Sequence, residues 1–157
     1  MPEAATVATS TSVDPIVKTV DVGVPPDAAF RLFTDEIASW WPLDTHSVGG
    51  SRATGIRVER GVGGLIEELG IEGPQRIWGT ITSWEPPSMF AFTFHPGVSA
   101  EQAGQVTVRF LPADVGSTVE LTHAGWEALG AARRQGYVTG WDVVLGAYVA
   151  AAPAGQA

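Results

Sequence analysis

The sequence contains no cysteine. This absence excludes disulfide bonds, thiol nucleophiles, thiolate metal sites and iron–sulfur clusters together. It is also typical of proteins that work in a reducing compartment, so we expect a cytoplasmic location.

Basic residues are scarce. Lys and Arg number 9 against 17 Asp and Glu, which gives a formal net charge of −8. The basic residues are scattered, and two are adjacent only at Arg133-Arg134. An acidic chain repels phosphate backbones and anionic lipid surfaces. We therefore expect neither nucleic acid nor a membrane among the partners.

Long apolar runs are also missing. Residues 1–14 are rich in Ala, Thr and Ser and lack the basic start and apolar centre of a secretory signal, so we interpret them as a flexible tail. Residues 143–152 form the most apolar stretch, which is too short to span a bilayer. Residues 15–153 then have the usual length of one domain.

Motifs for catalysis or metal binding are not evident. The histidines His46, His95 and His123 are far apart and form no paired spacing of the kind that zinc sites use. The sequence has no nucleophile elbow of the form GxSxG. The glycine-rich run Gly61–Gly64 lacks the Lys-Ser/Thr of a phosphate-binding loop. We therefore expect no metal and no cofactor, and we assign no catalytic residue.

The N-terminal part of the domain predicts a strand followed by two short helices. Apolar and polar residues alternate over Ile16–Val24, as in a strand with one buried face. Pro25-Pro26-Asp27 then suits the first turn of a helix, in which Phe30 and Phe33 share a face. A second short helix carries Trp40-Trp41 and ends before Pro42.

Residues 51–123 predict six consecutive strands with turn residues between them. Short connections of this kind imply antiparallel pairing. The expected strands are Arg52–Arg60, Leu65–Leu69, Arg76–Trp84, Met89–His95, Gln105–Leu111 and Ser117–His123.

The hydrophobic period changes after His123 and predicts one long C-terminal helix. Trp141, Val144, Leu145, Tyr148 and Val149 follow the spacing of one helical face. Because this is the one long amphipathic helix expected, it must cover the apolar face of the sheet. The predicted fold is α+β, with a curved antiparallel sheet of about six to seven strands around this helix and an apolar cavity between them.

The glycines at positions 136, 140 and 146 stand out within the expected helix. Each costs helix stability of about 1 kcal/mol relative to alanine. Their presence indicates that the helix packs closely against something bulky, and it also removes side chains that would fill space.

Five segments together resemble the START/Bet v 1-like (SRPBCC) superfamily, and in detail its Hsp90 ATPase activator homologue branch. The resemblance covers roughly residues 16–152 and implies a helix-grip fold with a ligand-accessible cavity. The segments are Val24–Phe30, Trp40-Trp41, Gly79–Pro87, Gly116–His123 and Gly140-Trp141.

The resemblance leaves three functions open. The branch includes binding proteins, a co-chaperone domain and cyclase or hydrolase enzymes, with no catalytic motif that could be carried over. We expect a non-enzymatic domain that binds a hydrophobic or amphipathic small molecule. The alternatives are a polyketide cyclase-like enzyme and a co-chaperone-type module that binds a protein partner.

Three polar residues are candidates for contacts with a ligand. His123 shares its strand face with apolar residues and is expected to point inward, where it either orients a ligand or bonds a nearby carbonyl. Glu67 and Glu68 are adjacent on one strand, so one should face inward and the other outward. Arg57 on the preceding strand would then form an ion pair with the inward Glu or anchor a ligand with it.

Aromatic residues supply the remaining candidates. Six tryptophans suit either a core or a pocket lining, because indole combines a large apolar area with one donor. Phe90, Phe92 and Phe94 lie on one face of a strand and form either core or cavity wall. The full set of expected cavity residues is Trp40, Trp41, Arg57, Glu67, Trp78, Phe92, His123 and Trp141.

Overall fold

The computed structural model describes residues 12–153. Residues 1–11 of the expected tail lie outside the described residues. Among residues 12–153, no helix has the length and apolar character needed to cross a membrane.

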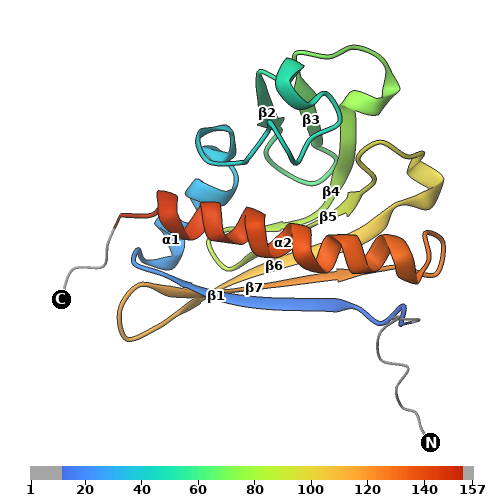
Figure 1. The fold of residues 1–157 in the computed structure, drawn as a ribbon. Helices are drawn as coiled ribbons and strands as arrows, with labels where there is room; N and C mark the ends of the chain where they lie inside the picture. The colour runs from blue at the N-terminus through green and yellow to red at the C-terminus, as the bar shows by residue number, and fades with distance from the viewer. Residues whose placement is uncertain (1–11, 154–157) are drawn as a thin grey trace, which may run out of the picture.

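A seven-stranded antiparallel sheet forms the body of the molecule, in the order β1-β7-β6-β5-β4-β3-β2 (Figure 1). The predicted sheet is confirmed, although β2 is shorter at both ends than the expected Arg52–Arg60, and Arg52 itself belongs to a 3₁₀ turn, η3 (Gly50–Arg52). The strands are β1 (Ile16–Val22), β2 (Gly55–Val58), β3 (Leu65–Leu69), β4 (Ile77–Glu85), β5 (Met89–Phe94), β6 (Gly104–Pro112) and β7 (Ser117–Ala124).

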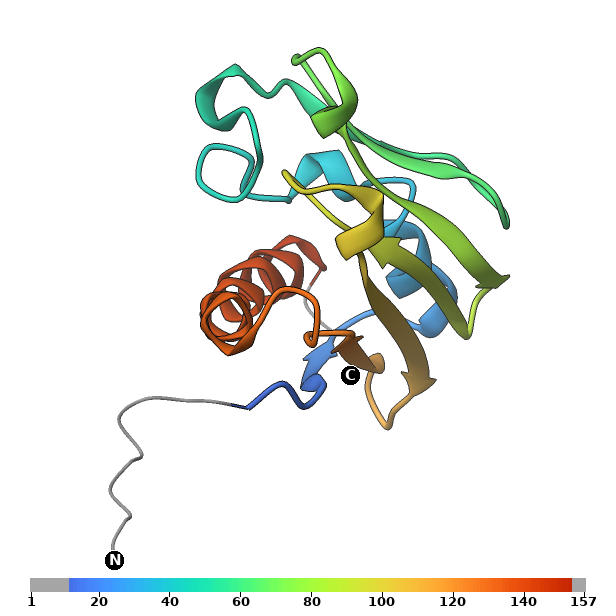
Figure 2. The same cartoon turned by 90° about the vertical axis from the view of Figure 1, so that its right-hand side faces the viewer.

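The helices lie where the sequence places them. Helix α1 (Pro26–Phe33) begins at a proline, whose fixed φ suits a first turn. The second short helix is a single 3₁₀ turn, η2 (Ile37–Ser39). Helix α2 (Ala131–Ala151) lies across the sheet, and Figure 2 shows the sheet curving around it. The helix-grip prediction is therefore confirmed.

The concave face of the sheet and one face of α2 enclose the core. Along β7 every second residue is buried, and His123 points inward with Val119 and Leu121 as expected. Helix α2 buries Trp141, Val144, Leu145 and Tyr148, whereas Val149, expected on the same face, is 36% exposed.

A hydrogen bond joins the two helices across this core. The Tyr148 hydroxyl of α2 donates to the carbonyl oxygen of Ala29 in α1 at 2.8 Å. Burial raises the pKa of Tyr148 well above its ordinary value, so this donor keeps its proton. The core therefore links α2 to the N-terminal part of the chain as well as to the sheet.

The glycines of α2 do not share one role. A Cβ at Gly140 would lie 3.8 Å from Cδ2 of His46, which is ordinary contact. At Gly136 and Gly146 a Cβ would meet no atom within 4 Å. The expectation that these glycines pack against bulky neighbours is therefore wrong at positions 136 and 146, where the helix faces open space.

Candidate ligand-binding site

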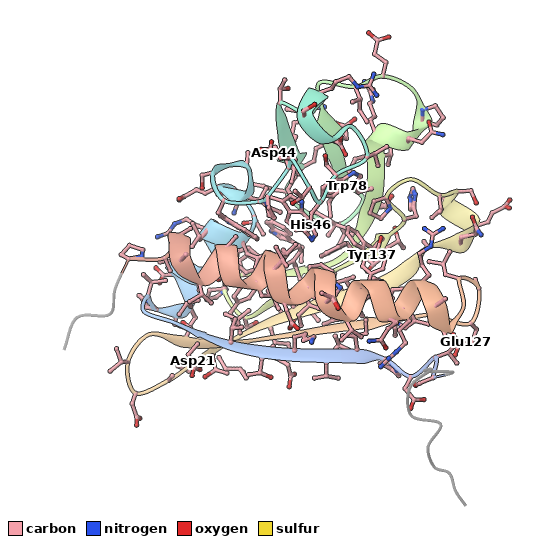
Figure 3. The ribbon with its side chains drawn as sticks, viewed as in Figure 1. Asp21, Asp44, His46, Trp78, Glu127 and Tyr137 are labelled. Atoms are coloured by element: carbon pink, nitrogen blue, oxygen red, sulfur yellow. The ribbon has the colours of Figure 1, made fainter. Side chains whose placement is uncertain are left out.

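An open pocket of about 700 Å³ lies beside the N-terminal half of α2, and we call it the α2 pocket. Figure 3 shows His46 and Trp78 above α2, near Tyr137, which α2 carries. The residues that line the α2 pocket are Trp41, Thr45, His46, Ser47, Val48, Trp78, Phe94, Pro96, Gly97, Ala132, Arg133, Gly136, Tyr137, Gly140, Trp141 and Val144.

One wall of the pocket is a single face of α2. Its members recur at helical spacing from Ala132 to Val144. Two of them, Gly136 and Gly140, have no side chain, which leaves room above the helix between Tyr137 and Trp141. The missing side chains of these glycines therefore help to create the pocket.

The opposite wall is the loop of residues 41–49, which joins η2 to η3. Trp41 Nε1 donates to the carbonyl oxygen of His46 at 2.8 Å, and Ser47 Oγ donates to the carbonyl oxygen of Leu43 at 2.6 Å. Thr45 Oγ1 lies 2.7 Å from His46 Nδ1. These bonds order the loop so that polar side chains face the pocket beside its aromatic walls.

Glu68 anchors this loop to the sheet. The carboxylate is fully buried and accepts hydrogen bonds from the backbone N–H groups of Val48 at 2.8 Å and Gly49 at 2.7 Å. It also accepts one from Trp78 Nε1 at 3.0 Å. A Cβ at Gly49 would lie 2.9 Å from Glu68 Oε2 and would also crowd Cγ2 of Ile71, so a larger residue would have to displace these two side chains.

As expected, one of the two adjacent acids faces inward and the other outward, but the inward residue is Glu68 and not the candidate Glu67. In the regular pairing of β2 with β3, Glu68 lies opposite the buried Ile56, whereas Glu67 lies opposite Arg57, whose side chain is more than half exposed. The sequence signal was the pair of acids in an otherwise apolar strand, which did not decide between Glu67 and Glu68.

Glu67 and Arg57 form an ion pair that does not line the pocket. The Glu67 carboxylate accepts from Arg57 Nε at 3.1 Å and also contacts Arg57 Nη2. The hydrogen bond and charge of Glu67 raise the pKa of Arg57. Arg76 Nε lies 3.7 Å from the other carboxylate oxygen, so two guanidinium groups cover Glu67.

His123 lies inside the core rather than in the pocket. Its Nδ1 accepts a hydrogen bond from Trp141 Nε1 at 3.0 Å, so in the neutral ring the proton is on Nε2. Its carbonyl oxygen accepts from Trp126 Nε1 at 2.9 Å. Burial lowers the pKa of His123 to about 3, which keeps the ring neutral at physiological pH.

We expect this buried histidine to make stability depend on pH. Because the pKa falls from 6.5 in the unfolded chain to about 3 in the folded protein, the unfolded state gains a proton first as the pH drops. The free energy of unfolding is therefore unaffected by this group above about pH 6.5. It decreases as the pH falls from 6.5 toward 3, by up to about 1.4 kcal/mol per pH unit. Chemical denaturation between pH 7 and 4.5 measures the slope.

The control for this prediction is His123→Gln, which removes the titrating ring and keeps an acceptor. Its free energy of unfolding should fall less steeply with decreasing pH than that of the unchanged protein. Equal slopes for the two proteins would contradict the assignment of the titration to His123.

The other expected residues divide between the pocket and the core. Trp41, Trp78 and Trp141 line the α2 pocket together. Trp40 is buried and donates from Nε1 to the carbonyl oxygen of Leu32 at 2.7 Å. Phe92 lines a small interior void instead. The expected set therefore comes together only in part.

Several lining residues were not expected from the sequence, among them His46, Arg133 and Tyr137. Burial raises the pKa of Tyr137, while the nearby charge of Arg133 opposes this. His46 belongs to an irregular loop, where neither alternation nor helical spacing predicts side-chain direction. Tyr137 lies four residues before Trp141 and therefore on the same helical face. This spacing is the sequence signal that could have identified Tyr137 as a lining residue.

The fold has known counterparts. The solution structure of the Aha1 dimer from Colwellia psychrerythraea matches with a TM-score of 0.65 and 16% identity, over 91% of this chain and 98% of that one. The crystal structure of protein NE0264 from Nitrosomonas europaea matches with a TM-score of 0.64 and 14% identity, over 88% and 94% of the two chains. At these identities the likeness concerns the fold.

A third solved structure has a higher sequence identity. The anthrahydroquino-γ-pyrone synthase Txn09, complexed with SUM, is 26% identical, with a TM-score of 0.57 over 87% of this chain and 90% of that one. No curated protein sequence matches significantly.

A family model identifies the chain more directly than these structures do. The model described as activator of Hsp90 ATPase homolog 1-like protein matches residues 23–150. The match includes α1, all strands after β1 and nearly all of α2. The chain belongs to the family of activator of Hsp90 ATPase homolog 1-like proteins.

Proposed function

We propose that this chain is a non-enzymatic domain that binds an apolar or amphipathic small molecule in the α2 pocket. The observation that carries the proposal is an open pocket of about 700 Å³ with five aromatic side chains in its walls. This volume falls within the usual range for small-molecule sites, which is roughly 300–1,000 Å³. The aromatic residues are Trp41, Trp78, Phe94, Tyr137 and Trp141.

Polar groups in the same pocket support an amphipathic ligand. Thr45, His46 and Ser47 line it from the loop, and Arg133 lines it from α2. The Tyr137 hydroxyl has no hydrogen-bond partner within residues 12–153, so it is available to a bound molecule. A few polar groups among apolar walls are the usual means of orienting a ligand.

An enzyme acting on a cyclic substrate is the second candidate. Txn09 is described as a synthase, and its 26% identity extends over most of both chains. His46 and Tyr137 are titratable side chains in the same pocket, which general acid–base chemistry requires. Chemical conversion of a bound molecule, followed by mass spectrometry, would favour this candidate over a binding protein.

A module that binds a protein partner has less support. Such a module needs a continuous exposed apolar patch of several hundred square ångströms. In the described part of the chain the exposed large apolar residues are spread over separate strands, turns and α2. They are Val17, Val48, Val62, Leu69, Leu111, Val115, Val143 and Val149.

The cytoplasmic location and the domain limits of 15–153 belong to the same proposal. A chain without cysteine suits a reducing compartment. The described elements run from β1 to the end of α2 at Ala151 as one sheet around one helix, which supports a single domain.

The six tryptophans offer a direct test of the binding site. We expect that titration with 8-anilinonaphthalene-1-sulfonate shifts the indole N–H signals of Trp41, Trp78 and Trp141 in a ¹H–¹⁵N spectrum, because these rings line the pocket. Trp84 lies outside the lining and serves as an internal control. Single Trp→Phe variants assign the signals.

Two results would contradict the proposal. The dye could fail to bind, or it could bind and shift Trp84 as much as the three pocket tryptophans. Either result would place apolar binding, if any, outside the α2 pocket.

A further inference from the structure

Four aromatic side chains form a closed ring at the inner end of the α2 pocket. The ring centroids of Trp41 and Trp78 are 5.2 Å apart, and those of Trp78 and Phe94 are 6.0 Å apart. Phe94 lies 5.7 Å from Trp141, which lies 6.0 Å from Trp41. Each ring therefore contacts the next, and together they separate the pocket from what lies beneath.

A small apolar void lies on the other side of these four residues. Its volume is about 10 Å³, which is close to that of one water-sized sphere. All four aromatic residues line both the void and the pocket. The rest of the void is lined by Phe33, Ile37, Val58, Ile66, Phe90 and Phe92.

Trp41 differs from the other three members of the ring in how it is held. Trp78 bonds to Glu68 from β4, Trp141 bonds to His123 from α2, and Phe94 ends β5. Trp41 lies in the 41–49 loop, and its indole bonds to a carbonyl oxygen of that same loop. It is therefore the member whose removal leaves the sheet and α2 intact.

We propose that Trp41 sets the depth of the α2 pocket, so that the site favours a flat aromatic acid over an extended alkyl acid. This inference rests on the proposed function of the pocket. A flat ring gains contact with the tryptophan faces, and aromatic pairs contribute beyond their buried area. An alkyl chain loses rotational freedom on binding, and the four rings prevent it from entering the interior.

The charge of the ligand follows from the polar lining. Arg133 is the permanently charged cation in the pocket, and the Tyr137 hydroxyl is a donor that has no partner within residues 12–153. The Ser47 hydroxyl already donates to the carbonyl oxygen of Leu43. No Asp or Glu lines the pocket within the described residues. A carboxylate therefore meets a cation and a free hydroxyl donor there, despite the acidic character of the whole chain.

A carbon-matched pair of acids tests the inference in the full chain. 2-Naphthoate and undecanoate each have eleven carbons, and their affinities can be compared by calorimetry. We expect 2-naphthoate to bind about tenfold more tightly, which corresponds to one or two aromatic contacts. Equal affinities, or tighter binding of undecanoate, would overturn the inference even if dye binding confirmed the pocket itself.

Trp41→Ala tests the residue directly. Removing the indole joins the pocket to the interior void, and each buried methylene then strengthens binding of an alkyl acid about fourfold. We expect the preference for 2-naphthoate to fall by about tenfold or to invert. Trp84→Ala is the matched control, because Trp84 lines neither space, and it should keep the original preference.

The outcomes separate the two proposals. An unchanged preference in folded Trp41→Ala, with circular dichroism like that of the unchanged protein, overturns the role of Trp41. If Trp41→Ala fails to fold, the ratio of affinities in the unchanged protein still decides the ligand class. If neither acid binds and the dye shifts no pocket tryptophan, the proposed function fails together with this inference.

Discussion

Replacement of Trp141 by alanine is expected to lower the free energy of unfolding by about 3–5 kcal/mol, the usual cost of removing a large buried aromatic side chain. Trp141 is 3% exposed and lies midway along α2. Its ring contacts Trp41, Phe94 and His123, which come from the loop, β5 and β7. The substitution therefore weakens the contact of α2 with three separate parts of the fold.

The lost hydrogen bond adds to the lost packing. Without the indole N–H, His123 Nδ1 is a buried acceptor with no partner, which costs about 1–3 kcal/mol unless water enters. The measurement is urea denaturation followed by circular dichroism. Val143→Ala is the control, since Val143 is 46% exposed on the same helix and should change stability by roughly 0.5 kcal/mol or less. A loss below roughly 1 kcal/mol for Trp141→Ala would mean that α2 does not stabilise the fold through this face.

The sheet could be predicted from the sequence because its strands are half-buried. β3 matches the expected Leu65–Leu69, and β7 extends the expected Ser117–His123 by one residue. In both cases turn residues mark the ends of the strand. The alternation of β7 also placed His123 inward correctly, because β7 keeps a regular register with β6 and β1. Where pairing is regular, the period of two is a reliable guide to which face is buried.

The pocket could be predicted only in part because it depends on irregular backbone. Helical spacing brought Trp141 to the correct face, but nothing in that spacing places the 41–49 loop opposite Gly140. That placement depends on the buried carboxylate of Glu68, which accepts hydrogen bonds from the backbone N–H groups of Val48 and Gly49. Alternation groups Glu67 with Leu65 and Leu69 and leaves open which of the two acids faces the core, so it did not identify Glu68 as the loop anchor.

Replacement of Gly136 by leucine should weaken binding of 8-anilinonaphthalene-1-sulfonate by about tenfold or more. Gly136 lines the α2 pocket, and a side chain built there meets open space. A leucine therefore enters the pocket without a clash and occupies volume that the dye would use. The loss corresponds to about 1.4 kcal/mol, less than the burial of one large apolar group contributes.

Gly146→Leu is a matched control for this substitution. Gly146 lies on the same helix, is also exposed and also faces open space, but it does not line the pocket. Both substitutions replace a helical glycine and should stabilise α2 by up to about 1 kcal/mol. Loss of binding in Gly136→Leu can then not be attributed to unfolding.

Dye titration of three proteins side by side shows whether the open space beside α2 is a ligand site. These are the unchanged chain, Gly136→Leu and Gly146→Leu. We expect the unchanged chain and Gly146→Leu to bind the dye with the same affinity, and Gly136→Leu to bind it about tenfold more weakly or not at all. Equal affinity in all three proteins would contradict binding in the α2 pocket, because a leucine at position 136 occupies volume that a ligand there needs.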